Sequence, residues 1–158
     1  MELWFSEKHT SDVQFSLRVD RQLYSAESEY QKIDIFDSRE FGRVLVLDGD
    51  IMLTERDEFV YDEMIVHVPM AVHPRAENIL VIGVGDGGVV KELTRYPWVT
   101  NIDLVEMDPM VAEACKKYLP NNACELETPR VHIHYENGLK YMRRHENEYD
   151  LIIIDSPD

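Results

Sequence analysis

An aspartate stands among the glycines of residues 81–90, which read VIGVGDGGVV. This run contains the end of an apolar strand, a loop with Gly83, Gly85 and Asp86, and the first turn of a helix. Such loops usually receive an anion, because free backbone N–H groups and a helix N-terminus point into them. The negative charge of Asp86 would repel an anion, so the loop raises the question of which ligand it accepts.

The spacing around this loop predicts a nucleoside site. Gly83, Gly85 and Gly88 match the pattern G-x-G-x-x-G, and Glu106 closes the next expected strand 20 residues after Asp86. An acidic residue at about this position typically binds ribose hydroxyl groups. The alternative is a tight strand–helix turn followed by a surface glutamate.

The charge of Asp86 narrows the choice of nucleoside. Against a pyrophosphate or an amino-acid carboxylate it would be repulsive by about 4 kcal/mol, at roughly 4 Å and an effective dielectric constant of about 20. Against an ammonium group the sign reverses, and decarboxylated S-adenosylmethionine is a nucleoside that carries an amine and lacks the carboxylate. The alternative is that Asp86 only caps the following helix, a common role for aspartate.

Composition and charge exclude several classes of protein. The chain has 158 residues, of which 44% are apolar, as is usual for a globular protein, and a net charge of −15. That charge argues against a nucleic-acid partner, since such proteins carry basic patches. No apolar stretch approaches the roughly 20 residues that span a bilayer, and the first residues do not resemble a secretory signal. We therefore expect a cytoplasmic protein without a membrane partner.

The first third of the chain reads as β-strands. Residues 14–19 and 30–36 alternate apolar and polar side chains, as half-buried strands do. Two apolar runs flank Asp48-Gly49, a pair that tolerates positive φ and predicts a hairpin. Residues 1–53 are therefore expected to form a small antiparallel β domain.

A helix is expected to follow from Thr54. Thr54 and Asp57 have the spacing of a capping box, with aspartate in place of the commoner glutamate. Apolar residues with helical spacing predict one buried face, made of Tyr61, Met64, Ile65 and Val68.

From Asn78 onward strands and helices alternate, which predicts an α/β fold with a parallel, doubly wound sheet. Its expected strands are 79–83, 101–107, 130–136 and 149–155, and its expected helices are 88–96, 109–119 and 138–145. If the fourth strand lies beside the first, as in doubly wound sheets, its apolar LIII run needs further strands to cover it. We therefore expect this sequence to be the front part of a longer enzyme.

Five segments in order resemble the spermidine synthase family of aminopropyltransferases: LVLDGDIMLTERDEFVYDEMIVHVPM, VIGVGDGG, LVEMDPMV, PRVHIHYENG and YDLIIIDSPD. The resemblance covers essentially the whole chain and about the first half of the family's usual length. It implies a β domain (1–53) followed by an incomplete, methyltransferase-like Rossmann domain (54–158). It also implies transfer of the aminopropyl group of decarboxylated S-adenosylmethionine, as co-substrate, to putrescine, giving spermidine and methylthioadenosine. The protein is expected to form a homo-oligomer and to need no prosthetic group.

The resemblance also implies roles for individual residues. Asp155 matches the catalytic aspartate, and Asp158 matches an aspartate that holds an amine of the diamine. The remaining matches are the ammonium-binding Asp86, the ribose-binding Glu106, the nucleoside contact Gln31, Tyr61 facing the amine channel, the loop glycines Gly83 and Gly85, and Asn137 with Gly138 near the adenine.

Four positions depart from the family pattern: Asp62, Val84, Asn137 and Pro157. Asn137 stands where an aspartate usually meets the adenine amino group, and its side-chain oxygen can still accept a hydrogen bond. Asp62 replaces a histidine or glutamine that helps bind the polyamine, so it belongs with the substrate-binding residues and leaves the acceptor amine open.

The expected chemistry explains the need for carboxylates. An alkyl amine has a pKa of about 10.4, so only its minor neutral form attacks the carbon beside the sulfonium, at a cost of about 4–5 kcal/mol near neutral pH. Asp155 is expected to accept the proton and orient the nitrogen. No metal is expected, and His132 and His134 are interpreted as ordinary sheet histidines.

Two other functions remain open on the sequence. A small-molecule methyltransferase would use the same nucleoside site with S-adenosylmethionine, and Asp86 opposes the carboxylate of that ligand. A non-catalytic remnant would bind polyamine or pair with a fuller subunit. For the 158-residue chain alone we expect weak turnover or none.

Overall fold

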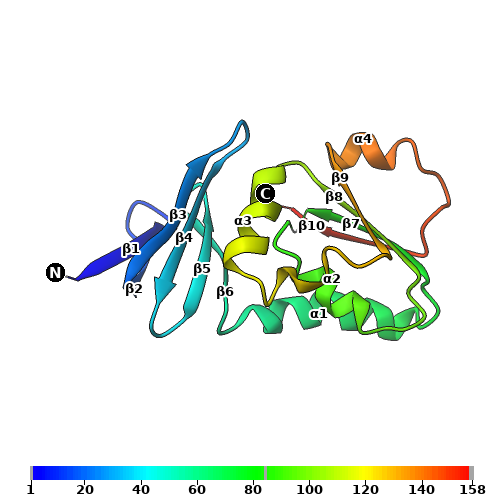
Figure 1. The fold of residues 1–158 in the computed structure, drawn as a ribbon, viewed down its shortest axis with the longest axis horizontal. Coiled ribbons are helices and arrows are strands. Elements are labelled where there is room, and N and C mark those ends of the chain that lie inside the picture. The colour runs from blue at the N-terminus through cyan, green and yellow to red at the C-terminus, as the bar shows by residue number, and fades with distance from the viewer. Residues whose placement is uncertain (1, 84, 157–158) are drawn as a thin grey trace. The chain divides into compact units, whose positions relative to one another are not determined.

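The computed structural model describes residues 2–83 and 85–156, which form two compact units, residues 1–58 and 59–158 (Figure 1). We describe each unit separately. Val84, Pro157 and Asp158, named above, lie outside the described residues.

The first unit consists of antiparallel β-strands. A two-stranded ribbon joins β1 (Leu3–Lys8) and β2 (Gln14–Val19). A four-stranded sheet follows in chain order: β3 (Arg21–Glu27), β4 (Lys32–Ser38), β5 (Gly42–Leu47) and β6 (Asp50–Thr54). The expected hairpin is confirmed, since β5 pairs with β6 around Asp48 (φ 52°) and Gly49 (φ 98°).

The second unit is a parallel four-stranded sheet with the order β10-β7-β8-β9. Its strands are β7 (Asn78–Gly83), β8 (Asn101–Glu106), β9 (Val131–Tyr135) and β10 (Leu151–Asp155). Its helices are α1 (Glu58–Val72), α2 (Gly88–Thr94), α3 (Pro109–Tyr118), the short 3-10 helix η1 (Ala123–Glu125) and α4 (Gly138–Met142). The expected α/β class is confirmed, including the fourth strand beside the first.

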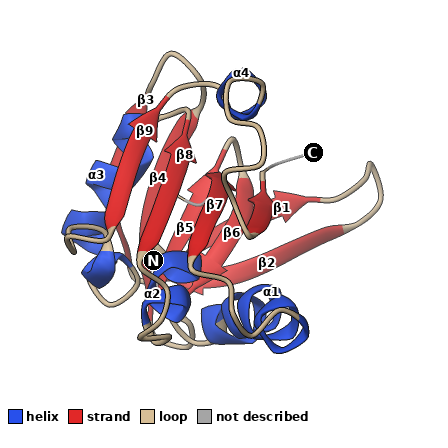
Figure 2. Ribbon diagram, turned by 90° about the vertical axis from the view of Figure 1, so that its right-hand side faces the viewer, coloured by secondary structure: helices blue, strands red, loops and turns tan. Residues whose placement is uncertain are grey.

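Helices cover both faces of this sheet, with α4 on the face opposite α1 and α2 (Figure 2). Tyr141 of α4 packs on Leu80 and Ile82 of β7 and on Val105 of β8. Gly138 permits this approach, because a Cβ there would lie 2.4 Å from Cγ2 of Ile82. Two helices end earlier than expected, since i→i+3 hydrogen bonds from Tyr96 and His145 replace their last turn.

The expected start and buried face of α1 are wrong. Thr54 ends β6, and its Oγ1 donates to Asp57 Oδ1 at 2.5 Å in the turn before the helix. Tyr61, Met64 and Val68, expected inside, are 54%, 62% and 52% exposed, whereas Asp62, Val66 and Met70 are buried. Apolar residues occur all round this helix, so their spacing did not identify the inner face.

Candidate active site

The carboxyl ends of β7, β8 and β10 bring the candidate residues of the second unit to one edge of the sheet. Asp155 ends β10 in register with Gly83, which ends β7. A Cβ at Gly83 would lie 1.9 Å from the carbonyl oxygen of Asp155, and Gly83 has φ +85°. Glycine is therefore required at this position for β10 to place Asp155 beside the loop.

Tyr61 of α1 contacts Asp155 directly. Its hydroxyl group donates a 2.7 Å hydrogen bond to Oδ1 of Asp155. Burial raises the pKa of Asp155, and this hydrogen bond opposes the rise. Removal of the hydroxyl from water, the same hydrogen bond, and the charges of Asp155, Asp62 and Asp86 raise the pKa of Tyr61 to about 12. Tyr61 therefore remains a protonated donor at physiological pH.

Asp86 lies in the loop between β7 and α2, and its Oδ1 accepts a 2.8 Å hydrogen bond from the backbone N–H of Gly88. The capping contact considered on the sequence is thus present, and it engages one of the two carboxylate oxygens. Burial raises the pKa of Asp86 to about 6, the Gly88 N–H opposes the rise, and the charge of Asp155 adds to it. Two acidic groups on neighbouring elements therefore favour a positively charged ligand.

Asp62 is buried on the inner face of α1, against the first residue of α2. A Cβ at Gly88 would lie 2.1 Å from its Oδ2, so its carboxylate packs on Gly88. Gly88 thus lies against the carboxylates of both Asp62 and Asp86. The extra carboxylate noted in the sequence therefore lies at the loop, rather than on the exposed surface of the helix.

Glu106 ends β8 and holds the loop through both carboxylate oxygens. Oε2 accepts from the N–H of Gly85 at 2.9 Å, and Oε1 accepts from the N–H of Asp108 at 2.8 Å. Burial raises the pKa of Glu106, and these N–H groups oppose the rise. The backbone N–H of Met107 also interacts with this carboxylate and lowers its pKa, so three backbone N–H groups hold Glu106 in place.

Asn137 precedes α4 at the same edge of the sheet and caps that helix. Its Oδ1 accepts from the N–H of Lys140 at 3.1 Å, and its backbone is extended. The cap engages one lone pair of Oδ1, which leaves the other and the amide N–H groups for a ligand.

Of the two remaining predicted site residues, one belongs to the first unit and the other lies outside the described residues. Gln31 belongs to the first unit, where its N–H donates to Ser28 Oγ at 3.1 Å in the turn before β4. Asp158 lies outside the described residues.

Sequence reasoning missed Asn122, which borders the loop from the segment after α3. It is 1% exposed, and its side-chain amide interacts with Asp86. It was not among the residues singled out in the sequence. Its proximity results from packing between segments distant in the chain, so no local pattern marks it.

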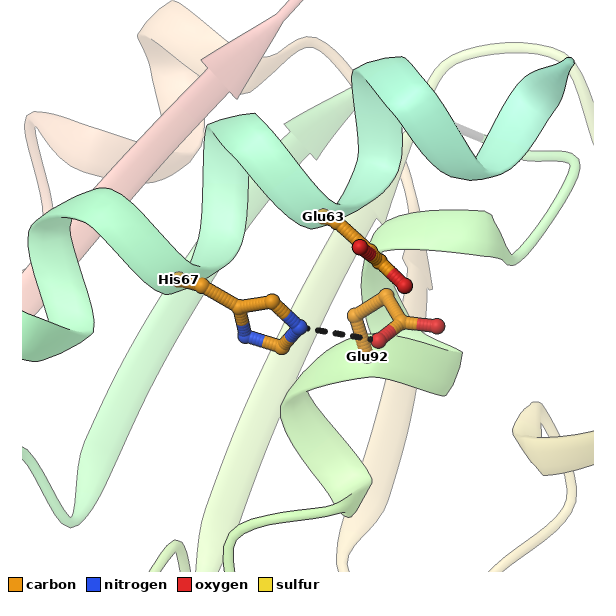
Figure 3. Close-up of side chains that lie close together, drawn as sticks. All are labelled: Glu63, His67 and Glu92. Atoms are coloured by element: carbon orange, nitrogen blue, oxygen red, sulfur yellow. Dashed lines mark hydrogen bonds and ion pairs between the residues drawn. The ribbon is translucent and has the colours of Figure 1, made fainter.

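Glu63, His67 and Glu92 form a cluster with the residue types of a metal site (Figure 3). His67 Nε2 lies 3.1 Å from Glu92 Oε2, and its Nδ1 lies 2.7 Å from the hydroxyl oxygen of Tyr96. The guanidinium of Arg95 lies 2.6 Å from the same Glu92 oxygen and 3.8 Å from Glu63. A cation thus already balances the carboxylates, and the cluster joins α1 to α2.

The strand histidines are sheet residues, as interpreted from the sequence. His134 Nε2 lies 2.7 Å from Oδ1 of Asp103 on the neighbouring strand. The hydroxyl of Tyr149 donates to Oδ2 of the same aspartate at 3.0 Å. This network anchors the segment that leads into β10. Within the part of the chain that the structure describes, no helix is long and apolar enough to cross a membrane.

Comparison with protein-family models identifies both units. Residues 58–158 match the spermine/spermidine synthase domain, and residues 3–55 match the spermidine synthase tetramerisation domain. The chain belongs to the spermine/spermidine synthase family. The resemblance noted in the sequence is confirmed.

Relatives within this family are similar along the whole chain. Polyamine aminopropyltransferases of Alkaliphilus oremlandii and Clostridium botulinum are each 61% identical over all 158 residues. The chain covers 56% of each, and so spans about half the length of the curated relatives it matches.

Solved spermidine synthases share the fold closely. One, in complex with the transition-state analogue AdoDATO, has a TM-score of 0.96 and 44% identity, over 99% of this chain and 54% of that one. The enzyme from Thermotoga maritima has a TM-score of 0.95 and 44% identity, over 98% of this chain and 54% of that one.

Proposed function

We propose that this chain carries the donor site and the catalytic aspartate of a polyamine aminopropyltransferase. The reaction transfers the aminopropyl group of decarboxylated S-adenosylmethionine to putrescine and gives spermidine and methylthioadenosine. The observation that carries the proposal is the pair of carboxylates, Asp86 and Asp155, beside a nucleoside-type glycine loop. Membership of the family and the name of its close relatives support it.

Binding of the donor follows from the two ends of that loop. The carboxylate of Glu106 accepts hydrogen bonds from the ribose hydroxyl groups, and Gly85 leaves room beside it, because a Cβ there would lie 3.0 Å from Oε2 of Glu106. Asp86 receives the ammonium group at the end of the aminopropyl chain. The carboxylate of intact S-adenosylmethionine would meet this same charge, at a cost of about 4 kcal/mol at roughly 4 Å.

Asp155 acts as the base. The neutral amine nitrogen attacks the carbon beside the sulfonium, the C–N bond forms, and the C–S bond breaks with its electron pair moving to sulfur. The proton leaves the nitrogen for Asp155, whose raised pKa makes it a better acceptor than an exposed aspartate. Tyr61 fixes one oxygen of this carboxylate and thereby orients the other. The leaving group is a neutral thioether, so the residues need to align and deprotonate the amine.

The remaining assignments concern the adenine and the acceptor amine. Asn137 and Gly138 border the adenine, Gln31 contacts the nucleoside, and Asp158 holds the far amine of the acceptor. Asp62, packed on Gly88, adds negative charge on the amine side of the loop. That charge favours a diamine such as putrescine, whose second nitrogen stays protonated.

The proposal extends to the localisation, the oligomeric state and the partners of the protein. We propose a cytoplasmic homo-oligomer without a prosthetic group, in keeping with the match of residues 3–55 to a tetramerisation domain. The net charge of −15 disfavours nucleic acid as a partner.

Calorimetric titration tests the donor assignment. Decarboxylated S-adenosylmethionine should bind at least tenfold more tightly than S-adenosylmethionine, a difference of about 1.4 kcal/mol or more. Tighter binding of intact S-adenosylmethionine would instead favour a methyltransferase. Release of methylthioadenosine in the presence of putrescine tests the reaction. A chain that binds the donor but releases no methylthioadenosine would favour a polyamine-binding role.

A further inference from the structure

Asn122 is held against the glycine loop by its backbone. A Cβ at Gly87 would lie 3.0 Å from the carbonyl oxygen of Asn122 and 2.9 Å from Cα of Ala123. Gly87 follows Asp86 and has φ +92°. The segment after α3 therefore packs directly on the residue next to the Asp86 carboxylate.

The side chain of Asn122 is a buried donor beside that carboxylate. Asn122 is 1% exposed, and among the described residues its Nδ2 has no acceptor at hydrogen-bond geometry. An unsatisfied buried donor costs about 1–3 kcal/mol, so such a group is rarely retained without a role. The amide interacts with Asp86 and lowers the pKa of that aspartate, against the effect of burial.

Several other described groups near Asp86 are acidic or neutral. Asp155 ends β10, Tyr61 and Asp62 lie on α1, and the buried thiol of Cys115 lies on α3. Burial and Asp155 favour the neutral form of Asp86, while backbone N–H groups and the Asn122 amide favour the anion. Because Gly88 contacts Oδ1, the second oxygen is the one that a side-chain donor can orient.

We propose that Asn122 is a positioning residue that donates from Nδ2 to the second oxygen of Asp86 and keeps this carboxylate ionised and oriented toward a cationic ligand. That the ligand is cationic rests on the proposed function. The coupling between Asn122 and Asp86 is a property of the chain itself.

The first experiment measures that coupling without a ligand. The ¹³C NMR signal of the Asp86 carboxyl group, assigned with Asp86→Asn, is titrated in the native chain, in Asn122→Leu and in Asn121→Leu. Leucine keeps a similar volume without a donor, and Asn121 is an exposed neighbour. The Asp86 pKa should rise by about one unit in Asn122→Leu and stay unchanged in Asn121→Leu. An unchanged Asp86 pKa in folded Asn122→Leu would overturn the proposal. If the leucine variant does not fold, the Asp86 pKa is measured in Asn122→Ala, where an unchanged value has the same meaning.

The second experiment measures affinity for decarboxylated S-adenosylmethionine at two pH values. If the Asp86 pKa rises from about 6 to about 7, the affinity of Asn122→Leu falls roughly fivefold at pH 6 and hardly at all at pH 8. An equal loss at both pH values would indicate a structural role and overturn the proposal. If the NMR shift is found but the native chain does not bind this donor, the proposed function fails while the coupling stands.

Discussion

The hydroxyl group of Tyr61 and Oδ1 of Asp155 lie 2.7 Å apart, joined by a hydrogen bond between residues 94 positions apart in the chain. The contact links helix α1 to the carboxyl end of β10. It fixes one oxygen of a half-buried carboxylate whose pKa is raised by burial. The proposed base is therefore oriented by a helix that precedes the sheet.

Tyr61→Phe tests this orientation. The variant loses the hydrogen bond that opposes the rise of the Asp155 pKa, and leaves the aromatic ring in place. For the proposed reaction we expect kcat to fall roughly tenfold, about 1.4 kcal/mol, and the acidic limb of its pH profile to move upward. Donor affinity should remain within about twofold. A normal kcat with an unshifted profile would rule out an orienting role for the hydroxyl.

Asp86→Asn tests the selection of an ammonium group. Asparagine keeps the shape and the oxygen that accepts from Gly88, but loses the charge. Affinity for decarboxylated S-adenosylmethionine should fall roughly 10–100-fold, about 1.4–2.8 kcal/mol, when measured by calorimetry. Methylthioadenosine lacks the amine and serves as the control, with an expected change below twofold. A loss that is the same for both ligands would place the effect on the nucleoside instead.

The raised pKa of Asp86 predicts a pH-dependent stability. Since its pKa is about 6 in the folded chain and 3.8 ordinarily, the folded state binds more protons between these values. The free energy of unfolding therefore decreases as pH rises through this window. Asp86→Asn should be more stable than the native chain by about 1–3 kcal/mol at pH 8 and by little at pH 4. Urea unfolding at both pH values checks this, and a gain that is equal at both would contradict the assignment.

Gly83→Ala tests the close approach of β10 to β7. The added Cβ would meet the Asp155 carbonyl at 1.9 Å, in a backbone with φ +85°. We expect a loss of stability of about 3 kcal/mol or more, measured by urea unfolding. Gly49→Ala is the matched control, because Gly49 has φ +98° and nothing within 4 Å of a Cβ. Its cost should be the backbone strain alone, about 1–2 kcal/mol. Equal costs at the two positions would show that the approach is not tight.

Local patterns predicted much of the fold. The Asp48-Gly49 turn, the alternation of strands and helices after Asn78, and the pairing of the fourth strand with the first were all predicted correctly. The inner face of α1 was not, because apolar residues occur all round this helix, whereas the residues buried in it are Asp62, Val66 and Met70. Strands β1 and β3 were not delimited, since both are largely exposed and have little apolar alternation.

The candidate site was likewise predictable only in part. Asp86 and Glu106 were predicted from the glycine loop and its spacing, and Asp155 from the resemblance to the family. Each ends a strand or follows one, and parallel strands bring those ends together. The contacts of Asp62 with Gly88 and of Asn122 with Asp86 depend on packing between distant segments, which sequence spacing does not encode. The role of Gln31 stays a prediction, since it lies in the first unit.

The tight fit of Gly83 against Asp155 limits how such an enzyme can be redesigned. A larger residue at position 83 would displace Asp155, so the carboxyl end of β7 offers no room for variation at this position. Helix α1 is different, because Tyr61 contacts Asp155 and Asp62 packs on Gly88 through side chains alone. Attempts to change the ligand preference of the proposed site should therefore vary residues of this helix and leave the strand ends unchanged.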